Sequence, residues 1–245
     1  GIKPFIIVAT VGTTSTGAID NVERIAGIAK KFNTWTHVDA AWAGSATVCP
    51  EHRNIIRGTD QVDSYVFNPH KWLLTNFDCS VLYVADSRPL NRALSITPEY
   101  LKNKDSDSGK VIDYKDWQIP LGRRFRSLKL WFVIRSYGSD GLRSYIRGHV
   151  DAAKWLENML NDSGELALAA PRSLSLICFH HTAGNKATEN LLKFLNESKL
   201  FFLTHTYIKG RYMIRVSIGG TYTRKDHLER LWKKIQEYLR GNANQ

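Results

Sequence analysis

The first hydrophobic run of the chain, residues 5–11, is short and uninterrupted, which is typical of a strand buried on both faces. A stretch rich in glycine and hydroxyl side chains, residues 12–17, ends this run and predicts a turn. Residues 20–32 then carry apolar side chains at helical spacing, after a start that resembles a capping box at Asp20. Another apolar run begins at Trp35. This order predicts two parallel strands joined by a right-handed helical crossover.

Two more strands and a long helix follow in the pattern. Short apolar runs at 64–67 and 80–84 predict the strands. The charged segment 98–116 has no clear periodicity, so we expect a mobile loop that could close over a site as a lid. A helix is predicted from about residue 122 to residue 137, and Gly138 would end it.

The pattern changes near residue 140, where shorter helices and strands alternate. The expected elements are a helix near 141–160, a strand at 173–180, a helix at 186–198, strands at 201–206 and 211–218, and a last helix from Thr223. We therefore predict an α/β protein with two domains: residues 1–139, built on a mostly parallel sheet flanked by helices, and a smaller α+β domain over residues 140–245.

The chain has 245 residues and a formal net charge of +11. Its cations are spread along the sequence except for a group within residues 123–129, which lies among apolar side chains and predicts an amphipathic helix with a charged outer face. The sequence contains no nucleic-acid recognition motif, so nucleic-acid binding is only a distant alternative and we expect no such partner. The charge favours solubility and the attraction of anionic ligands.

The three cysteines, Cys49, Cys79 and Cys178, are widely spaced and odd in number. They fit neither a disulfide framework nor a zinc site, so we expect no metal and a reducing, cytoplasmic setting. No apolar run approaches the roughly 18 residues of a membrane span, and we expect no membrane partner. Because the chain opens almost directly in a buried-strand pattern and without methionine, we expect it to be the later portion of a longer polypeptide.

Lys71 is the most informative residue of the sequence. It lies between His70 and Trp72, just after the apolar stretch 65–67. One interpretation is a lysine whose stem lies along apolar surface while its ammonium group stays in water. The other is a partly desolvated amine that forms a Schiff base with an aldehyde.

Asp39 favours the second interpretation. Asp39 follows the strand that begins at Trp35, and Lys71 follows the next strand, at 64–67. Both residues therefore lie at the carboxyl edge of the sheet, where ligands bind in open α/β folds. A pyridoxal ring needs a carboxylate at its ring nitrogen, and the small residues 40–44 leave room for a flat ring. The alternative for Asp39 is a strand-end residue that caps the next helix, and the alternative for His70 is a packed imidazole bonded to the backbone.

These residues resemble a known family. The run 68–74 (Asn-Pro-His-Lys-Trp-Leu-Leu), with 37–41 (His-Val-Asp-Ala-Ala) before it and Asp78-Cys79 after it, is similar to the pyridoxal-phosphate-dependent group II decarboxylases. The branch it resembles is aromatic-L-amino-acid decarboxylase, with the plant tryptophan and tyrosine decarboxylases. The similarity extends through residues 98–102, 113–118 and 123–129 and covers nearly the whole chain, most weakly after residue 160.

The resemblance implies a fold-type-I cofactor domain, a pyridoxal 5'-phosphate cofactor and a role for each matching residue. Lys71 would bind the cofactor aldehyde, and Asp39 would pair with the ring nitrogen. Ala41 would lie against one face of the ring. Asn68 and His70 would lie beside the cofactor, with His70 near its phosphate and counted among the catalytic residues.

On the substrate side, the resemblance places Thr14 close to the substrate and the cofactor's edge. Trp42 stands where the family usually has tyrosine, and we expect little effect from this difference. Gly122 corresponds to a glycine in plant tryptophan decarboxylases and a serine in many tyrosine decarboxylases. Animal enzymes acting on dihydroxyphenylalanine also have glycine there, so the choice among tryptophan, tyrosine and dihydroxyphenylalanine stays open, with a weak preference for indolic substrates.

Tyr100 falls in the predicted loop, which in this family reaches into the active site of the partner subunit of a homodimer. Its phenol would return a proton to the α-carbon after carbon dioxide leaves, giving the arylalkylamine. In the aldehyde synthases of the family a phenylalanine stands at this position and the carbon reacts with oxygen instead. Because this sequence has tyrosine, we expect the amine.

The family also has an earlier segment with a histidine that stacks on the other ring face and with groups that cradle the phosphate. None of that segment precedes Gly1. We therefore keep a non-catalytic fragment as an alternative to an active decarboxylase.

Overall fold

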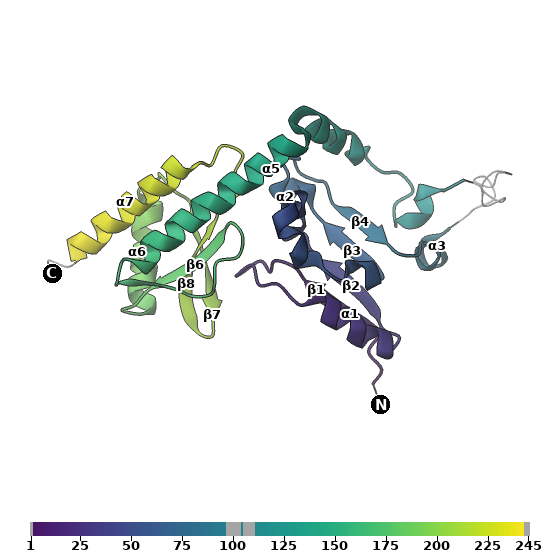
Figure 1. Cartoon of the computed structure of the whole chain (residues 1–245), viewed down its shortest axis with the longest axis horizontal. Coiled ribbons are helices and arrows are strands. Elements are labelled where there is room, and N and C mark those ends of the chain that lie inside the picture. Colours follow the sequence, from purple (N-terminus) through teal and green to yellow (C-terminus); the bar gives the residue numbers. More distant parts are fainter. Residues whose placement is uncertain (1, 97–103, 105–110, 243–245) are drawn as a thin grey trace.

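The computed structural model describes residues 2–96, 104 and 111–242, and within them it forms two four-stranded sheets joined by one long helix (Figure 1). The helices are α1 (Val22–Lys31), α2 (Pro69–Trp72), α3 (Arg88–Leu94), α5 (Arg126–Asn161), α6 (Asn185–Glu197) and α7 (Lys225–Asn242). The strands are β1 (Ile6–Thr10), β2 (Trp35–Asp39), β3 (Ser64–Phe67), β4 (Val81–Val84), β5 (Leu166–Leu168), β6 (Leu176–His181), β7 (Thr204–Ile208) and β8 (Arg211–Ser217). Short 3-10 helices are η1 (Ala43–Val48), η2 (Pro50–Ile56), η3 (Thr59–Gln61) and η5 (Tyr114–Trp117).

The first sheet has the order β1-β2-β3-β4, with β1, β2 and β3 parallel and β4 antiparallel to β3. Helix α1 makes the crossover from β1 to β2 and buries Val22, Ala26 and Ala29. The parallel register sets Thr10 opposite Asp39, so the strands end at one edge of the sheet. The predicted α/β class and the parallel strand pair are confirmed.

The start of α1 differs from the sequence prediction by one residue. Asn21 is the N-cap, and its side-chain oxygen accepts a hydrogen bond from the Arg24 amide at 3.0 Å. The Asp20 carboxylate instead accepts one from the Thr10 amide at 2.8 Å, at the end of β1. Asp20 and Asn21 are both residue types that cap helices well. Because Asp20 binds the Thr10 amide at the end of β1, Asn21 caps the helix.

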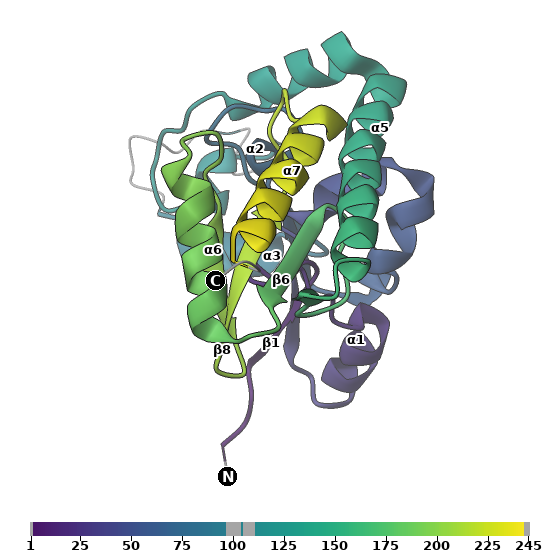
Figure 2. The ribbon, with the colours of Figure 1, turned by 90° about the vertical axis from the view of Figure 1, so that its left-hand side faces the viewer.

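The second sheet has the order β5-β6-β8-β7 and is antiparallel throughout. The C-terminal half of α5, α6 and α7 lie side by side over one face of it (Figure 2). Their apolar side chains enclose the larger hydrophobic core with Ile177, Phe179, Ile214 and Val216 from the strands. The sequence prediction found β6, β7 and β8 but missed the three-residue strand β5.

Helix α5 contradicts two expectations from the sequence. It begins at Arg126 rather than near Gly122, and it does not end at Gly138. Gly138 has a φ of 62° and a ψ of 179°, which makes a kink, and the helix then continues to Asn161. Glycine can adopt this backbone without a steric penalty, so the residue expected to end the helix bends it instead.

The kink lies close to the predicted domain boundary at residues 139 and 140, and the division into two domains stays a prediction. Before the kink, the apolar side of α5 is largely uncovered: Leu128, Trp131 and Phe132 are 42%, 54% and 55% exposed. The predicted amphipathic helix is therefore present, but no described residue buries its apolar side fully. None of the helices in the described part of the chain combines the length with the hydrophobicity that a bilayer span requires.

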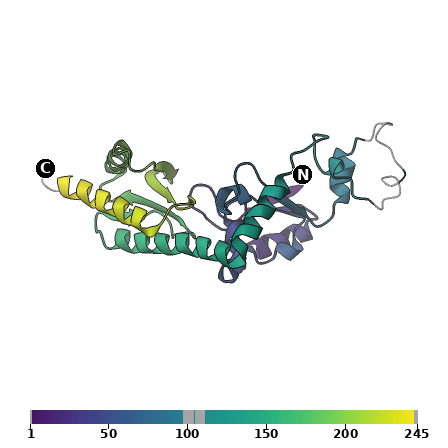
Figure 3. The ribbon, with the colours of Figure 1, turned by 90° about the horizontal axis from the view of Figure 1, so that it is seen from above.

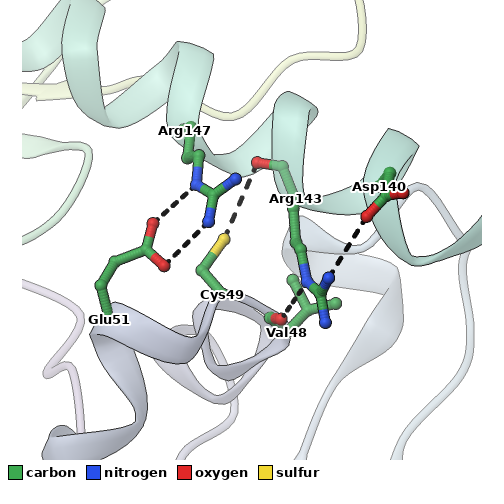
Figure 4. Close-up of polar contacts among 6 residues, drawn as sticks. All are labelled: Val48, Cys49, Glu51, Asp140, Arg143 and Arg147. Carbon is green, nitrogen blue, oxygen red and sulfur yellow. Dashed lines mark hydrogen bonds and ion pairs between the residues drawn. The ribbon is translucent and has the colours of Figure 1, made fainter.

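Two arginines beyond the kink hold α5 against η1 and η2 (Figure 4). The Arg147 guanidinium donates to both carboxylate oxygens of Glu51, at 2.6 and 3.0 Å. Arg143 donates from Nε to the Val48 carbonyl at 3.0 Å. Viewed from above, α5 links the two halves of an elongated molecule (Figure 3). These contacts therefore fix how the linking helix lies on the first half.

The hydrogen bonds from Arg147 lower the pKa of Glu51 from 4.5 to about 2. A carboxyl group whose pKa is lower in the folded state stabilises the fold above its unfolded pKa, and this contribution is lost as the pH falls through the folded pKa. The Glu51 contribution should therefore be complete at pH 7 and disappear between about pH 4.5 and pH 2.

We predict that Glu51→Gln lowers the Tm at pH 7 by an amount on the order of 1 °C, because an exposed ion pair contributes little. The difference from wild type should shrink below about pH 4.5 and approach zero near pH 2, as measured by thermal denaturation across a pH series. The control is Glu189→Gln, which removes an exposed ion pair with Lys186 inside α6. A difference of equal size at pH 7 and pH 3 would contradict the ionic origin of the Glu51 contribution.

Candidate active site

A cleft of about 280 Å³ lies between the carboxyl edge of the first sheet and strand β8 of the second. Its lining residues are Thr10, Gly12, Thr13, Thr14, Asp39, Ala41, Trp42, Lys71, Arg215, Ser217 and Gly219. The structure thus brings together five residues singled out from the sequence: Thr14, Asp39, Ala41, Trp42 and Lys71. A larger hollow of about 470 Å³ near β3 and β4 is lined by apolar, aromatic and hydroxyl side chains and has no charged one.

Asp39 is the last residue of β2, and its backbone and side chain are both held. Its carbonyl accepts from the Val11 amide at 2.8 Å, and its Oδ1 accepts from the Ala41 amide at 2.9 Å. No described residue donates to Oδ2. One oxygen therefore binds the turn after β2, and the other is available to a ligand. The next helix, η1, starts without a side-chain cap, so the alternative of Asp39 as a helix cap is wrong.

Lys71 lies on α2, a single turn that starts with Pro69 directly after β3. The turn is tied to the neighbouring strand end because the Asn68 amide donates to the Ala41 carbonyl at 2.9 Å. The Lys71 side chain lines the cleft and is exposed. The partial desolvation expected from the sequence is therefore not present among the described residues.

The neighbour of Lys71, Trp72, anchors the turn in the protein interior. Its side chain is 1% exposed and stacks on Trp42, with ring centroids 5.1 Å apart. Its indole Nε1 donates to Nδ1 of the buried His149, on α5, at 3.0 Å. Burial lowers the pKa of His149, which favours the neutral ring that can accept this bond. The buried Trp72 therefore fixes the position of the adjacent Lys71 at the cleft.

Sequence reasoning missed His149. The signal was available, since His149 falls on the apolar face of its helix beside Ile146 and Val150, where a polar ring needs a partner. The same helix face carries Tyr145, whose hydroxyl donates to the Gly219 carbonyl at 2.9 Å. These contacts connect the turn bearing Lys71 to the second half of the molecule.

His70 and Asn68 lie beside the cleft but do not line it. Nδ1 of His70 lies 2.7 Å from the Cys79 carbonyl oxygen and 2.9 Å from the Cys79 amide nitrogen, and the ring contacts Phe77 edge-on with the ring centroids 4.9 Å apart. This is the packed imidazole of the alternative interpretation. The Asn68 side chain accepts from the Ser80 hydroxyl at 2.7 Å. Their roles toward a cofactor stay predictions.

The basic group at the start of α5 binds the segment that follows α2. Arg126 donates to the Asp78 carboxylate at 3.0 Å, and Lys129 donates to the Asn76 carbonyl at 2.9 Å. The hydrogen bond from Arg126 lowers the pKa of Asp78. These two cations therefore have partners within the protein, and the segment they hold also contacts His70.

The turn at residues 13–17 brings Thr14 to the cleft. Side chains of the second sheet and its preceding loop donate to three of its carbonyl oxygens: Arg215 Nε to Thr14 at 2.8 Å, Cys178 Sγ to Ser15 at 3.1 Å, and Ser173 Oγ to Gly17 at 2.5 Å. A Cβ on Gly17 would lie 2.6 Å from the Ser173 Cβ, so only glycine permits this approach. Sequence reasoning missed Arg215, Ser217 and Gly219, which no motif links to the turn.

Two predicted residues are not placed in the cleft. Gly122 is exposed, nothing lies within 4 Å of a Cβ built on it, and it does not line the cleft. Tyr100 lies outside the described residues, as does most of the predicted loop at 98–116, although residues 114–117 at its end form η5. The substrate and proton-transfer roles of these residues stay predictions.

The chemistry of the cleft fits the ring of pyridoxal phosphate. The ring carries an aldehyde that an amine can bind and a basic nitrogen that a carboxylate can hold protonated. Lys71 supplies the amine, and Asp39 supplies a carboxylate oxygen without a donor among the described residues. Ala41, which also lines the cleft, is small enough to leave space for a flat ring.

Comparisons with known proteins agree with this fit. A sequence profile of the pyridoxal-dependent decarboxylase conserved domain matches residues 1–182. The chain is 46% identical to tryptophan decarboxylase 2 of Oryza sativa subsp. japonica, over 97% of this chain and 49% of that protein. It is 47% identical to phenylacetaldehyde synthase of Arabidopsis thaliana, over 97% of this chain and 50% of that protein.

A crystal structure of the Oryza sativa enzyme TDC with PLP and tryptamine matches the fold with a TM-score of 0.94 and 41% identity. The match covers 97% of this chain and 51% of that one. The chain spans about half the length of the curated relatives it matches. Since the profile covers most of the chain and the same fold is found in a PLP-bound relative, the chain belongs to the pyridoxal-dependent decarboxylase family.

Proposed function

We propose that this protein removes the α-carboxylate of an aromatic L-amino acid, with pyridoxal phosphate as cofactor, and releases the arylalkylamine and carbon dioxide. The observation that carries the proposal is the placement of Lys71 and Asp39 in one cleft, on neighbouring parallel strand ends. When bound, pyridoxal phosphate supplies an electron sink for the bond that breaks at the α-carbon.

Five residues have defined tasks in this proposal. Asp39 would hold the ring nitrogen protonated through Oδ2, because a positive charge is stabilised beside a carboxylate. Lys71 would hold the cofactor covalently through its amine. The Trp42–Trp72 stack keeps the lysine at the correct end of the cleft. Tyr100 donates the proton that replaces the carboxylate, as the family resemblance implies.

The proposed substrate is an aromatic amino acid, with tryptophan ahead of tyrosine and dihydroxyphenylalanine. The relatives support this range, since they include tryptophan decarboxylase 2 and an L-tyrosine/L-DOPA decarboxylase 2. The glycine at position 122 leaves space for an indole if that position faces the substrate.

We also propose a homodimer in the cytoplasm. The exposed apolar side chains at the start of α5, Leu128, Trp131 and Phe132, offer a surface that a second subunit could cover. The loop bearing Tyr100 would then act in the partner's cleft. The cytoplasmic setting is supported by three buried cysteines that form no disulfide.

The test of the proposed function is a product assay of the protein supplied with pyridoxal phosphate and, separately, tryptophan, tyrosine, dihydroxyphenylalanine and phenylalanine. We expect carbon dioxide and the amine in equal amounts, with tryptophan turned over fastest. Lys71→Ala should lower kcat by at least about 1,000-fold, because the covalent attachment of the cofactor is lost. Absence of product from all four amino acids would refute the proposal and favour the non-catalytic alternative.

The second candidate, an aldehyde synthase, is raised by the 47% identity to phenylacetaldehyde synthase. We predict that Tyr100→Phe shifts the product from amine to aldehyde, ammonia and hydrogen peroxide, because the α-carbon then lacks its proton donor and is oxidised by molecular oxygen, with water supplying the aldehyde oxygen. Chromatography of the products, with a peroxide assay, measures the shift, and Tyr114→Phe on η5 serves as control. An unchanged amine yield in Tyr100→Phe would remove the assigned role, and aldehyde from the wild type would establish the second candidate.

A further inference from the structure

His149 contacts segments from both halves of the molecule, although it does not itself line the cleft. It lies in the second half of α5 and is 3% exposed. Its ring stacks on Trp72, the residue next to Lys71, with ring centroids 6.4 Å apart. It also meets Tyr145 edge-on and faces the backbone of the loop 218–224, between β8 and α7.

The hydrogen bond from Trp72 determines which ring nitrogen of His149 carries the proton. An indole N–H can only donate, so Nδ1 of His149, 3.0 Å from the Trp72 Nε1, is the acceptor. Burial lowers the pKa of His149, so the ring is neutral at pH 7 and its single proton is on Nε2. One nitrogen therefore binds α2, and the other is a donor for the loop, whose backbone at Gly220 and Thr223 favours a proton on the ring.

The loop after β8 packs against the same group of rings. A Cβ on Gly219 would lie 3.4 Å from Cδ1 of Trp72, and the Gly219 carbonyl accepts a hydrogen bond from the Tyr145 hydroxyl at 2.9 Å. Gly219 lines the cleft, as Lys71 does. The rings of Trp72, Tyr145 and His149 therefore lie where the turn that carries Lys71 meets the loop that carries Gly219.

The position of Lys71 depends on Trp72, because α2 has only four residues and the Lys71 side chain is exposed. The Trp72 side chain is 1% exposed, and His149 accepts from its one N–H group. A buried donor without an acceptor costs free energy, so loss of the acceptor favours a shifted indole. Since the two residues are adjacent in one turn, a shift of Trp72 also moves the Lys71 amine. A displacement of about 1 Å can slow a reaction about 100-fold.

We propose that His149 is a positioning residue for Lys71: by accepting from Trp72 it sets where the lysine amine lies in the cleft, and by facing the loop after β8 it relates this position to the second half of the molecule. This inference rests on the proposed function, because it names a residue that controls the reactive lysine of that reaction. It predicts a change in how fast Lys71 reacts and little change in how tightly the amino acid binds.

The test separates the two nitrogens of His149 by substitution. His149→Asn keeps an acceptor near the position of Nδ1, and His149→Gln keeps a donor near the position of Nε2. His149→Leu removes both. The control is Ile146→Val, a change on the same helix and in the same hydrophobic cluster as Trp72 that removes no side-chain hydrogen bond.

Four quantities are measured for each protein. Hydrogen exchange of the Trp72 indole N–H, followed by NMR and assigned with Trp72→Phe, reports the hydrogen bond. The rate at which pyridoxal phosphate and borohydride modify Lys71, located by mass spectrometry, reports the position of the amine. In that reaction the amine and the aldehyde condense with loss of water, and borohydride reduces the resulting C=N bond. The kinetic constants kcat and KM report turnover, and the Tm reports folding.

We expect His149→Leu and His149→Gln to open the Trp72 N–H to exchange and to lower both the Lys71 modification rate and kcat by about 10- to 100-fold. His149→Asn should keep the N–H protected and both rates within about threefold of wild type, although its Tm should fall about as far as that of His149→Gln. KM should change by less than about threefold in every variant. Ile146→Val should match the wild type in exchange and in both rates.

Several results would overturn the inference. Rates that follow the Tm, with His149→Asn as slow as His149→Gln, would show that His149 only stabilises the fold, and so would unfolding of all three His149 variants. A Trp72 N–H that exchanges freely in the wild type, or a wild type in which Lys71 is not modified, would also contradict it. If Lys71 modification depends on His149 as expected but the wild type decarboxylates no amino acid, the proposed function fails and this inference stands.

Discussion

The turn at residues 13–17 meets the second sheet through its carbonyl oxygens, and the cleft depends on this contact. Peptide carbonyls that leave water need donors, and here Arg215, Cys178 and Ser173 provide them. Two of these donors lie on strands formed more than 160 residues later in the chain. The end of β1 and the face of β8 therefore become opposite walls of one cavity. Asp39 and Lys71 would otherwise lie on an open sheet edge.

The part of the cleft that contains Lys71 depends on the neighbouring Trp72. Helix α2, which carries Lys71, is a single turn, and the buried Trp72 anchors it by stacking on Trp42 and by a hydrogen bond to His149. His149 belongs to α5, which Arg147 ties to Glu51 on the first half of the molecule (Figure 4). The same helix therefore carries both the support of Lys71 and part of the core of the second sheet. A reactive group placed in this way can be exposed and still be well positioned.

The sequence predicted the parts of the site that depend on local order. Asp39 and Lys71 follow buried strands, and parallel strands bring their carboxyl ends together, so their shared cleft could be foreseen. Arg215 could not, because its place depends on how a distant sheet packs. Gly138 was misread because glycine permits both a helix end and a kink, and only the packing of α5 decides between them. Gly122 is exposed and does not line the cleft, so only the resemblance connects it to the substrate.

We propose that Lys71 is the residue that binds the cofactor covalently. The test is to add pyridoxal phosphate, reduce with borohydride and map the modified peptide by mass spectrometry. We expect one modified lysine, Lys71, and much less modification in an Asp39→Asn protein, where the ring nitrogen lacks its partner. Modification of other lysines with Lys71 left intact, or equal labelling of all lysines, would contradict the account.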